Sequence, residues 1–123
     1  MQKAKEMLAS AQRDITAKDY ASANNRAYYS IFHAMRAVLA LDGEDYKKHS
    51  AVIARFTLNY LKSEILPREY SKLITNASLI RNRSDYEDFY ICSVADTNAL
   101  YSGAVSFCAE IEKYLDTRYK AGS

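Results

Sequence analysis

Four polar side chains that stand close together in the sequence have the types needed to bind a phosphate. Apolar residues recur at helical spacing up to residue 79, which places these groups on the last turn of a predicted helix and on the turn after it: Arg81, Asn82, Asp85 and Tyr86. A planar guanidinium can offer two parallel N–H groups to a phosphate, and an amide or a phenol beside it can orient the ligand. The same groups could simply satisfy one another, because Arg81 and Asp85 stand at positions i and i+4.

RNA cleavage without a metal requires more than a cation on the phosphate. It also needs a base for the 2′-hydroxyl proton and an acid for the leaving oxygen. Tyr86 is close to Arg81, but a phenol with an ordinary pKa of about 10 is a poor base at neutral pH compared with an imidazole at about 6.5. The chain has two histidines, and His33 or His49 could serve only if the fold brings one of them to Arg81. No nucleophile elbow or Gly-rich phosphate loop is present, which disfavours other hydrolases and phosphate-loop enzymes.

Basic residues are concentrated in the middle of the chain. Residues 46–83 contain eight Lys and Arg against two Glu, whereas the whole chain has a formal net charge of only +2. A basic middle is compatible with a surface that faces phosphate and also with ordinary solvated helices. Arg26 and His33 share one face of a predicted helix with the Tyr29 hydroxyl between them, so this strip could line a cleft or a subunit contact, or form the rim of the core. The candidate contacts for RNA or nucleotide are Arg81, Arg83, Asn82, His33, Arg26, Lys47 and Lys48.

Length and composition indicate one helical domain. The 123 residues include only three Gly and one Pro, with 49% apolar and 26% charged residues, which argues against many short strands and against disorder. We expect a single domain over residues 1–123. No apolar run approaches the roughly 18 residues of a membrane span and no secretion signal opens the chain, so we expect a cytoplasmic protein. Cys92 and Cys108 are interpreted as buried thiols, and the sequence indicates no metal or other cofactor.

Apolar residues at spacings of three and four predict five helices. The first two cover residues 3–16 and 20–41, and the third covers about residues 49–61. The fourth runs from residue 67 into the polar stretch at 81–86, and the fifth covers about 25 residues after residue 93. Their ends carry recognisable signals. Asp19 is a good N-cap, Gly43 fits the left-handed position after a helix, and Pro67 fits a first helical turn. Ser93 and Asp96 are spaced as a capping box. Connectors this short favour antiparallel neighbours and hence an all-α, up-and-down bundle.

Four separated segments carry a family resemblance, namely residues 26–37, His49-Ser50, residues 66–70 and residues 81–86. Together they resemble a HEPN domain of the small stand-alone bacterial and archaeal kind, over about residues 4–118. The resemblance implies a helical bundle that usually dimerises, with two copies of the motif helix meeting at a cleft. It also implies a frequent association with a minimal nucleotidyltransferase, and for many members a metal-independent ribonuclease activity in toxin–antitoxin or defence systems.

The family motif is an Arg, a polar residue directly after it and a His a few positions later. Arg81 and Asn82 match the first two positions, but Tyr86 stands where the His is expected. In some members a Tyr two residues beyond that His is modified by the nucleotidyltransferase, and Asp88 stands there in this chain. Losing the histidine should cost a catalyst a factor of about 10² to 10⁴.

This departure leaves three hypotheses. The first is a HEPN protein that binds RNA or nucleotide, or that partners a minimal nucleotidyltransferase, with weak or no ribonuclease activity. The second is an active metal-independent endoribonuclease, with Arg81 on the phosphate, Asn82 orienting it and Tyr86 replacing the histidine. The third is a purely structural dimerisation module, in which Arg81 pairs with Asp85 and the cluster stabilises the contact between two copies.

Overall fold

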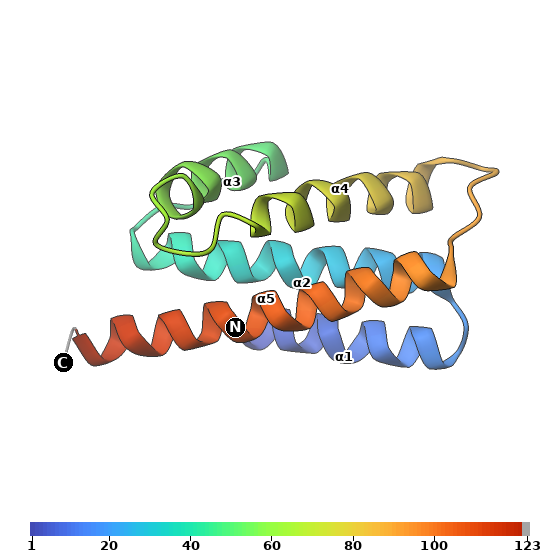
Figure 1. Ribbon diagram of the computed structural model, residues 1–123, viewed down its shortest axis with the longest axis horizontal. Helices are drawn as coiled ribbons and strands as arrows, with labels where there is room; N and C mark the ends of the chain where they lie inside the picture. The colour runs from blue at the N-terminus through green and yellow to red at the C-terminus, as the bar shows by residue number, and fades with distance from the viewer. Residues whose placement is uncertain (122–123) are drawn as a thin grey trace.

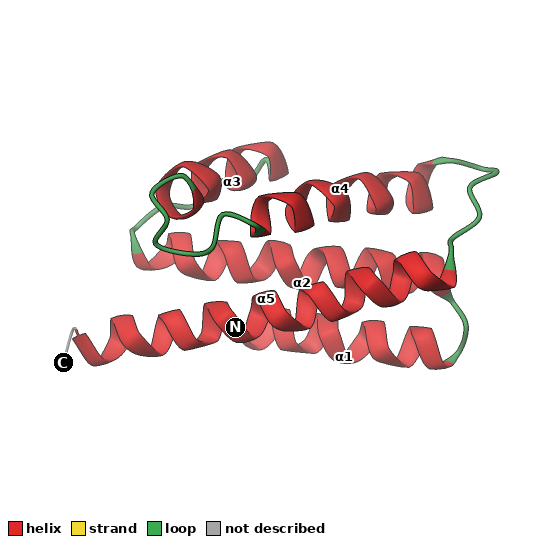
Figure 2. Ribbon diagram, in the orientation of Figure 1, coloured by secondary structure: helices red, strands yellow, loops and turns green. Residues whose placement is uncertain are grey.

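Five α-helices and one short π-helical segment make up the computed structural model, which describes residues 1–121 (Figure 1). The elements are α1 (Gln2–Thr16), α2 (Tyr20–Leu41), α3 (His49–Phe56), η1 (Thr57–Leu61), α4 (Tyr70–Tyr86) and α5 (Val94–Ala121). Loops and turns connect them, and residues 1–121 contain no strand (Figure 2). The predicted all-α bundle is confirmed. None of the helices in this range is both long enough and apolar enough to span a membrane.

Helix α2 is the centre of the bundle. It contacts α1, α3, α4 and α5, and Figure 1 shows α3 and α4 on one side of it and α1 on the other. Its apolar stripe is wide because eleven of its 22 residues are buried, whereas a helix on the surface needs only one buried face. The helix therefore fixes the relative positions of α3 and α4, which carry most of the polar residues singled out above.

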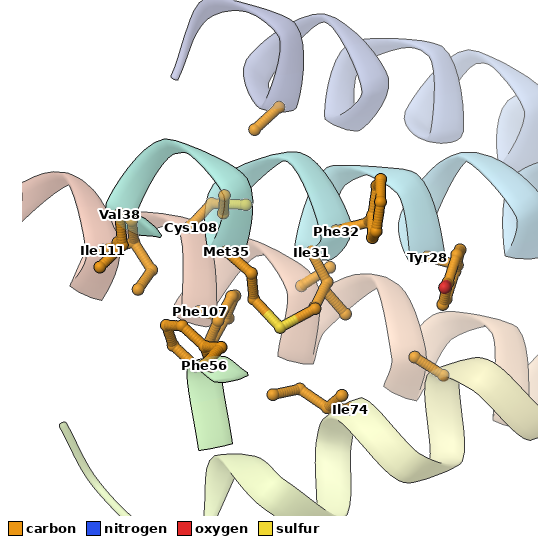
Figure 3. Packing of buried hydrophobic residues seen from close by; sticks show 14 of the residues in the cluster. Tyr28, Ile31, Phe32, Met35, Val38, Phe56, Ile74, Phe107, Cys108 and Ile111 are labelled. Atoms are coloured by element: carbon orange, nitrogen blue, oxygen red, sulfur yellow. The ribbon is translucent and has the colours of Figure 1, made fainter. Parts of the chain in front are cut away.

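The core is formed where α2, α3, α4 and α5 meet. Ile31 and Met35 of α2 point toward Phe56, Ile74 and Phe107, which come from the other three helices (Figure 3). The rings of Phe56 and Phe107 pack edge to face, with centroids 5.8 Å apart. Each such side chain contributes about 1.5–3 kcal/mol when it leaves water, so this packing holds α3 firmly against the other helices.

The predicted helix caps are largely confirmed. The Asp19 carboxylate accepts a hydrogen bond from the Ser22 backbone N–H at 3.3 Å, and the Ser93 hydroxyl accepts one from the Asp96 N–H at 3.2 Å. Gly43 follows α2 with φ +75°, the left-handed conformation that glycine adopts without strain. These local signals set the start of α2 and α5 and the end of α2.

The start of the fourth helix was predicted too early. Helix α4 begins at Tyr70, three residues after Pro67. The Tyr70 N–H bonds to the Pro67 carbonyl and the Ser71 N–H to the Arg68 carbonyl, both with i→i+3 spacing. The chain therefore passes through a tighter turn before the regular i→i+4 bonding of the α-helix begins.

The third predicted helix is divided into α3 and η1. The Lys62 N–H bonds to the Thr57 carbonyl five residues earlier, which is the π-helical pattern. A turn of this width lets Leu61 face the core together with Phe56, five positions before it, and both side chains are buried. The apolar pattern of the sequence was correct here, but it did not reveal the wider turn.

The two cysteines differ in burial. Cys108 is buried, and burial raises the pKa of its thiol to about 11. Cys92 is only half-buried and lies 3.4 Å from the Ser84 hydroxyl. The prediction of a buried thiol is therefore confirmed for Cys108 and is wrong for Cys92, which lies in the connector between α4 and α5, outside the packed helices.

Candidate phosphate-binding pocket

The last two turns of α4 place Arg81 against α2. Ile74, Ala77 and Ile80 form the buried face of this helix, so Arg81, next in the chain after Ile80, is drawn partly into the bundle. Its side chain is only 17% exposed. Helix α4 ends at Tyr86, as predicted for the polar stretch at the end of a helix.

Three polar groups surround the Arg81 guanidinium. One terminal nitrogen donates to the Tyr29 hydroxyl at 3.1 Å and the other to the Asn82 amide oxygen at 3.3 Å. Nε lies 3.0 Å from an Asp85 carboxylate oxygen, yet it makes no hydrogen bond because its N–H is not directed at that oxygen. The predicted pairing of Arg81 with Asp85 is present as an ion pair, and the guanidinium still has a buried donor without a hydrogen-bonding partner.

Aromatic rings enclose the faces of the same guanidinium. Its central carbon lies 5.3 Å from the ring centroid of Tyr28, 5.5 Å from that of Tyr29 and 5.6 Å from that of Tyr86. A cation over a ring is attracted by the negative face of the π-system, and partial burial strengthens this attraction. The rings therefore fix the orientation of Arg81 without neutralising its charge.

A pocket of about 200 Å³ opens beside Arg81. It is lined by Tyr28 of α2, by His49, Ser50 and Ile53 of α3, and by Ser78, Arg81 and Asn82 of α4. Sites that enclose a whole small molecule usually measure roughly 300–1,000 Å³, so this one can take a phosphate group but not a complete nucleotide. The Ser78 hydroxyl is buried in this pocket and interacts with the Tyr28 hydroxyl.

The fold brings His49 to Arg81, from the first position of α3. The His49 ring packs on Phe32 with centroids 4.1 Å apart, and its Nδ1 lies 2.9 Å from the Tyr28 hydroxyl. Burial, followed by the charges of Arg81 and Arg36, lowers the pKa of His49 below its ordinary value of 6.5. This downward shift of the pKa favours the neutral imidazole.

The start of α3 adds further positive potential to the pocket. No side chain caps this helix at Lys48, and Ser50 of its first turn lines the pocket. Uncapped backbone N–H groups and the helix dipole both favour an anion at such an end. The pocket thus combines a guanidinium, an amide, three hydroxyls and a helix N-terminus around an imidazole.

Comparison with known proteins identifies the family of the chain. The family model described as "HEPN domain" matches residues 1–118. The chain belongs to the HEPN family. A UPF0332 protein of Pyrococcus horikoshii is 47% identical over 53 residues, which are 43% of this chain and 37% of that protein. A protein of Methanocaldococcus jannaschii named as a candidate toxin is 35% identical over 83 residues, which are 68% of this chain and 62% of that protein.

A second protein of Methanocaldococcus jannaschii named as a candidate toxin is 27% identical over 115 residues, which are 94% of this chain and 78% of that protein. The chain therefore covers 37% and 62% of the length of the first two relatives and 78% of this third one. These relatives support the family and agree with the sequence-based resemblance.

Tyr86, which stands at the histidine position of the HEPN motif, does not line the pocket. Its side chain is 72% exposed, and its ring is stacked over Arg81. Among the residues that line the pocket, the only imidazole is that of His49, on another helix. The prediction named His49 only as a conditional candidate, because nothing in the sequence showed that the start of α3 packs beside α4.

His33 and Arg26 lie outside this pocket. His33 lines a separate hollow with Arg36 and Asp45, and burial together with the charges of Lys3 and Arg36 lowers its pKa. Arg26 donates to the Asn25 side chain, which in turn donates to Asp85. The predicted polar strip on α2 consists of Arg26, Tyr29 and His33. Tyr29, at its centre, contacts Arg81, and its ring lies 6.0 Å from the His33 ring. Arg26 and His33, at the two ends, have different neighbours.

The remaining predicted contacts are exposed. Arg83 lies 4.0 Å from Glu87 on the outside of α4, and Lys47 and Lys48 immediately precede His49. All three side chains are accessible to a long polyanion but do not line the pocket. Within residues 1–121 no group of three or more His, Cys, Asp and Glu side chains is arranged to hold a metal ion.

Proposed function

We propose that this HEPN protein binds RNA, with one backbone phosphate in the pocket between α3 and α4. The observation that carries the proposal is the position of Arg81, whose oriented guanidinium lines a pocket of phosphate size. Charge-assisted hydrogen bonds from a guanidinium to phosphate oxygens are among the strongest in proteins. Lys47, Lys48 and Arg83, all exposed around this region of the chain, would contact neighbouring phosphates.

A binding titration tests this proposal. The affinity of the natural chain for a fluorescent single-stranded RNA is compared with that of Arg81→Ala and of Arg68→Ala. Arg68 is a matched control because it also pairs with a carboxylate four positions away, at 3.7 Å, but on the exposed surface. We expect Arg81→Ala to weaken binding by about tenfold to 100-fold, the effect of losing a hydrogen bond to a charged group, and the affinity to fall steeply with salt.

The same variants examine the structural alternative. If Arg81 only stabilises the bundle, Arg81→Ala will lower the melting temperature and leave RNA and nucleotide affinity equal to that of Arg68→Ala. That result would contradict the proposal. Competition with free mononucleotide then shows whether a single nucleotide or a chain of phosphates is the preferred ligand.

Metal-independent RNA cleavage is the second candidate function. The specific observation in its favour is that a neutral imidazole, that of His49, lies in the same pocket as Arg81. The names of the two archaeal relatives, which describe candidate toxins, are compatible with such an activity.

A homodimer and a nucleotidyltransferase partner remain proposals that follow from family membership. Exposed apolar side chains in the connector after α4 support a protein contact at that connector, since Phe89 is 96% and Ile91 is 87% exposed. Light scattering of the natural chain measures the solution mass, and a monomer at micromolar concentration would contradict the dimer.

A further inference from the structure

We propose that His49, a residue outside the HEPN motif, is the base that removes the 2′-hydroxyl proton of an RNA bound in this pocket, and that Tyr28 holds its ring in place. The inference rests on the RNA binding proposed above and assigns a chemical role to a residue at that site. It replaces the earlier prediction that Tyr86 takes the place of the motif histidine.

The geometry separates the two nitrogens of His49. Nδ1 is tied to the Tyr28 hydroxyl at 2.9 Å, and the ring rests against Phe32. Within residues 1–121 the other nitrogen, Nε2, has no hydrogen-bonding partner, and the His49 side chain lines the pocket that Arg81 also lines. When Nδ1–H donates to the Tyr28 oxygen, Nε2 carries the lone pair and can accept a proton from a ligand.

The surrounding charges favour the neutral form of the His49 imidazole, which is the form that can accept a proton. The cations that act on His49 are Arg81 of α4 and Arg36 of α2, and both oppose a positive charge on the imidazole. Tyr28 and Phe32 cover the ring from α2 and bring no carboxylate to it. The nearest acid of the cluster, Asp85, is paired with Arg81. The imidazole is thus neutral before the reaction and becomes cationic only when it accepts the proton.

The reaction balances without any further reagent. His49 Nε2 takes the proton of the 2′-hydroxyl, and the 2′-oxygen forms a bond to the adjacent phosphorus while the bond from phosphorus to the 5′-oxygen breaks. The 5′-oxygen takes up a proton from water, and His49 later returns its proton to solvent. The products are a 2′,3′-cyclic phosphate and a 5′-hydroxyl end, and Arg81 stabilises the negative charge on the phosphoryl oxygens in the transition state.

Cleavage of a labelled RNA in the presence of EDTA tests this assignment. The natural chain should produce the cyclic phosphate. A DNA strand of the same base sequence lacks 2′-hydroxyl groups, so it should bind without being cut. His49→Ala should lower the cleavage rate by about 100-fold or more while RNA affinity changes little, because Arg81 remains. Added imidazole should restore part of the lost rate in His49→Ala, which a purely structural histidine would not allow.

Tyr28→Phe is a second variant that retains the aromatic ring in the core. It removes the oxygen that orients His49, so we expect the cleavage rate to fall by about tenfold and the RNA affinity to change by less than the rate does. The rate of the natural chain should rise with pH through the lowered pKa of His49, below 6.5, and then level off. In His49→Ala this rise should be absent.

The outcomes separate the inference from the proposed function. RNA binding without cleavage by the natural chain would overturn the role of His49 and leave the binding function intact. Cleavage by His49→Ala at the natural rate, or no response of that slow variant to imidazole, would also overturn the role. If the natural chain does not bind RNA, both proposals fail.

Discussion

Two arginines at opposite ends of the bundle are surrounded by the same types of residue. Arg81, near the end of α4, contacts Asp85 and three tyrosines, and Arg118, near the end of α5, contacts an aspartate and two tyrosines (Figure 1). Arg118 donates to the hydroxyls of Tyr60 at 3.2 Å and Tyr114 at 2.9 Å, and to the Asp42 carboxylate at 3.1 Å.

The partners of the two arginines are arranged differently. The bonds of Arg118 join the last helix to Asp42, 76 residues earlier, and to Tyr60, 58 residues earlier, and they raise its pKa. The carboxylate beside Arg81 is on the same helix, so that ion pair joins no distant segments. Only the Arg81 region also has a pocket with an imidazole. Residue types alone therefore do not distinguish a structural arginine from a ligand-binding one. The span of the bonds does not distinguish them either, because Arg81 also bonds across 52 residues to Tyr29, but the imidazole in the adjoining pocket does.

Replacing Arg118 should give the largest effect on stability. Arg118→Ala removes two hydrogen bonds that connect α5 to η1 and to Asp42 at the end of α2, together with one bond inside α5, and we expect the melting temperature to fall by about 5 °C. RNA affinity should remain within about twofold of the natural value, because the lost bonds lie at the other end of the bundle. Calorimetry combined with the RNA titration measures both quantities. If Arg118→Ala instead reduced RNA binding as strongly as Arg81→Ala, the distinction between the two ends would be wrong.

Neutralising Asp85 should change RNA affinity, whereas neutralising Asp42 should change thermal stability. Asp85→Asn keeps an oxygen for the Asn25 amide but frees Arg81 from a competing anion, so we expect RNA affinity to rise by about threefold. Asp42→Asn weakens the bonds from Arg118 and from Tyr60, so it should lower the melting temperature without changing RNA affinity. Equal RNA affinity in Asp85→Asn and the natural chain would show that Asp85 does not compete with the ligand.

Acid should destabilise the protein first through His49 of the Arg81 pocket and His33 of the separate hollow on α2. The pKa values of His33 and His49 are lowered in the folded state, so between their folded values and 6.5 the unfolded chain binds more protons. The stability that depends on these neutral rings is fully present above pH 6.5 and is lost as the pH falls through the folded pKa values. Melting temperatures measured from pH 7.5 to pH 5 should therefore fall below about pH 6.5.

A double variant provides the control for this effect. His33→Asn combined with His49→Asn should remove the decrease above pH 5, while the loss at lower pH remains. Glu44 contributes to that later loss, because its hydrogen bonds from Arg55 and Tyr46 lower its pKa below the ordinary 4.5. An unchanged decrease between pH 6.5 and pH 5 in the double variant would show that other groups are responsible.

Local signals predicted most of the fold. The caps at Asp19 and Ser93 were predicted because a side-chain oxygen bonds to a backbone N–H only three residues away. The cluster after residue 79 was likewise predicted because its members are neighbours on one helix. The start of α4 and the π-helical turn at η1 were not predicted. Whether the backbone forms hydrogen bonds over three, four or five residues at these places depends on how the turn packs against the core.

The site itself could be predicted only in part. Arg81 and Asn82 were predicted because they are adjacent in the chain and match the HEPN motif. The contact between Tyr28 and His49, and the position of both beside Arg81, depend on how α3 packs against α2 and α4. That packing is set by buried side chains such as Phe56 and Ile74 from well-separated parts of the sequence. Contacts between residues that are far apart in the chain leave no local signal in the sequence.

The division of the pocket among α2, α3 and α4 has a consequence for the life of the polypeptide. Tyr28, His49 and Arg81 leave the ribosome at different times, and they come together only after the helices between them have packed. A fragment cut in the connector between η1 and α4 contains either Tyr28 and His49 or Arg81, but not all three, and an incomplete nascent chain that lacks Arg81 is in the same situation. Neither can form the complete pocket. Any activity of the site can therefore begin only after α2, α3 and α4 have been synthesised and have packed together.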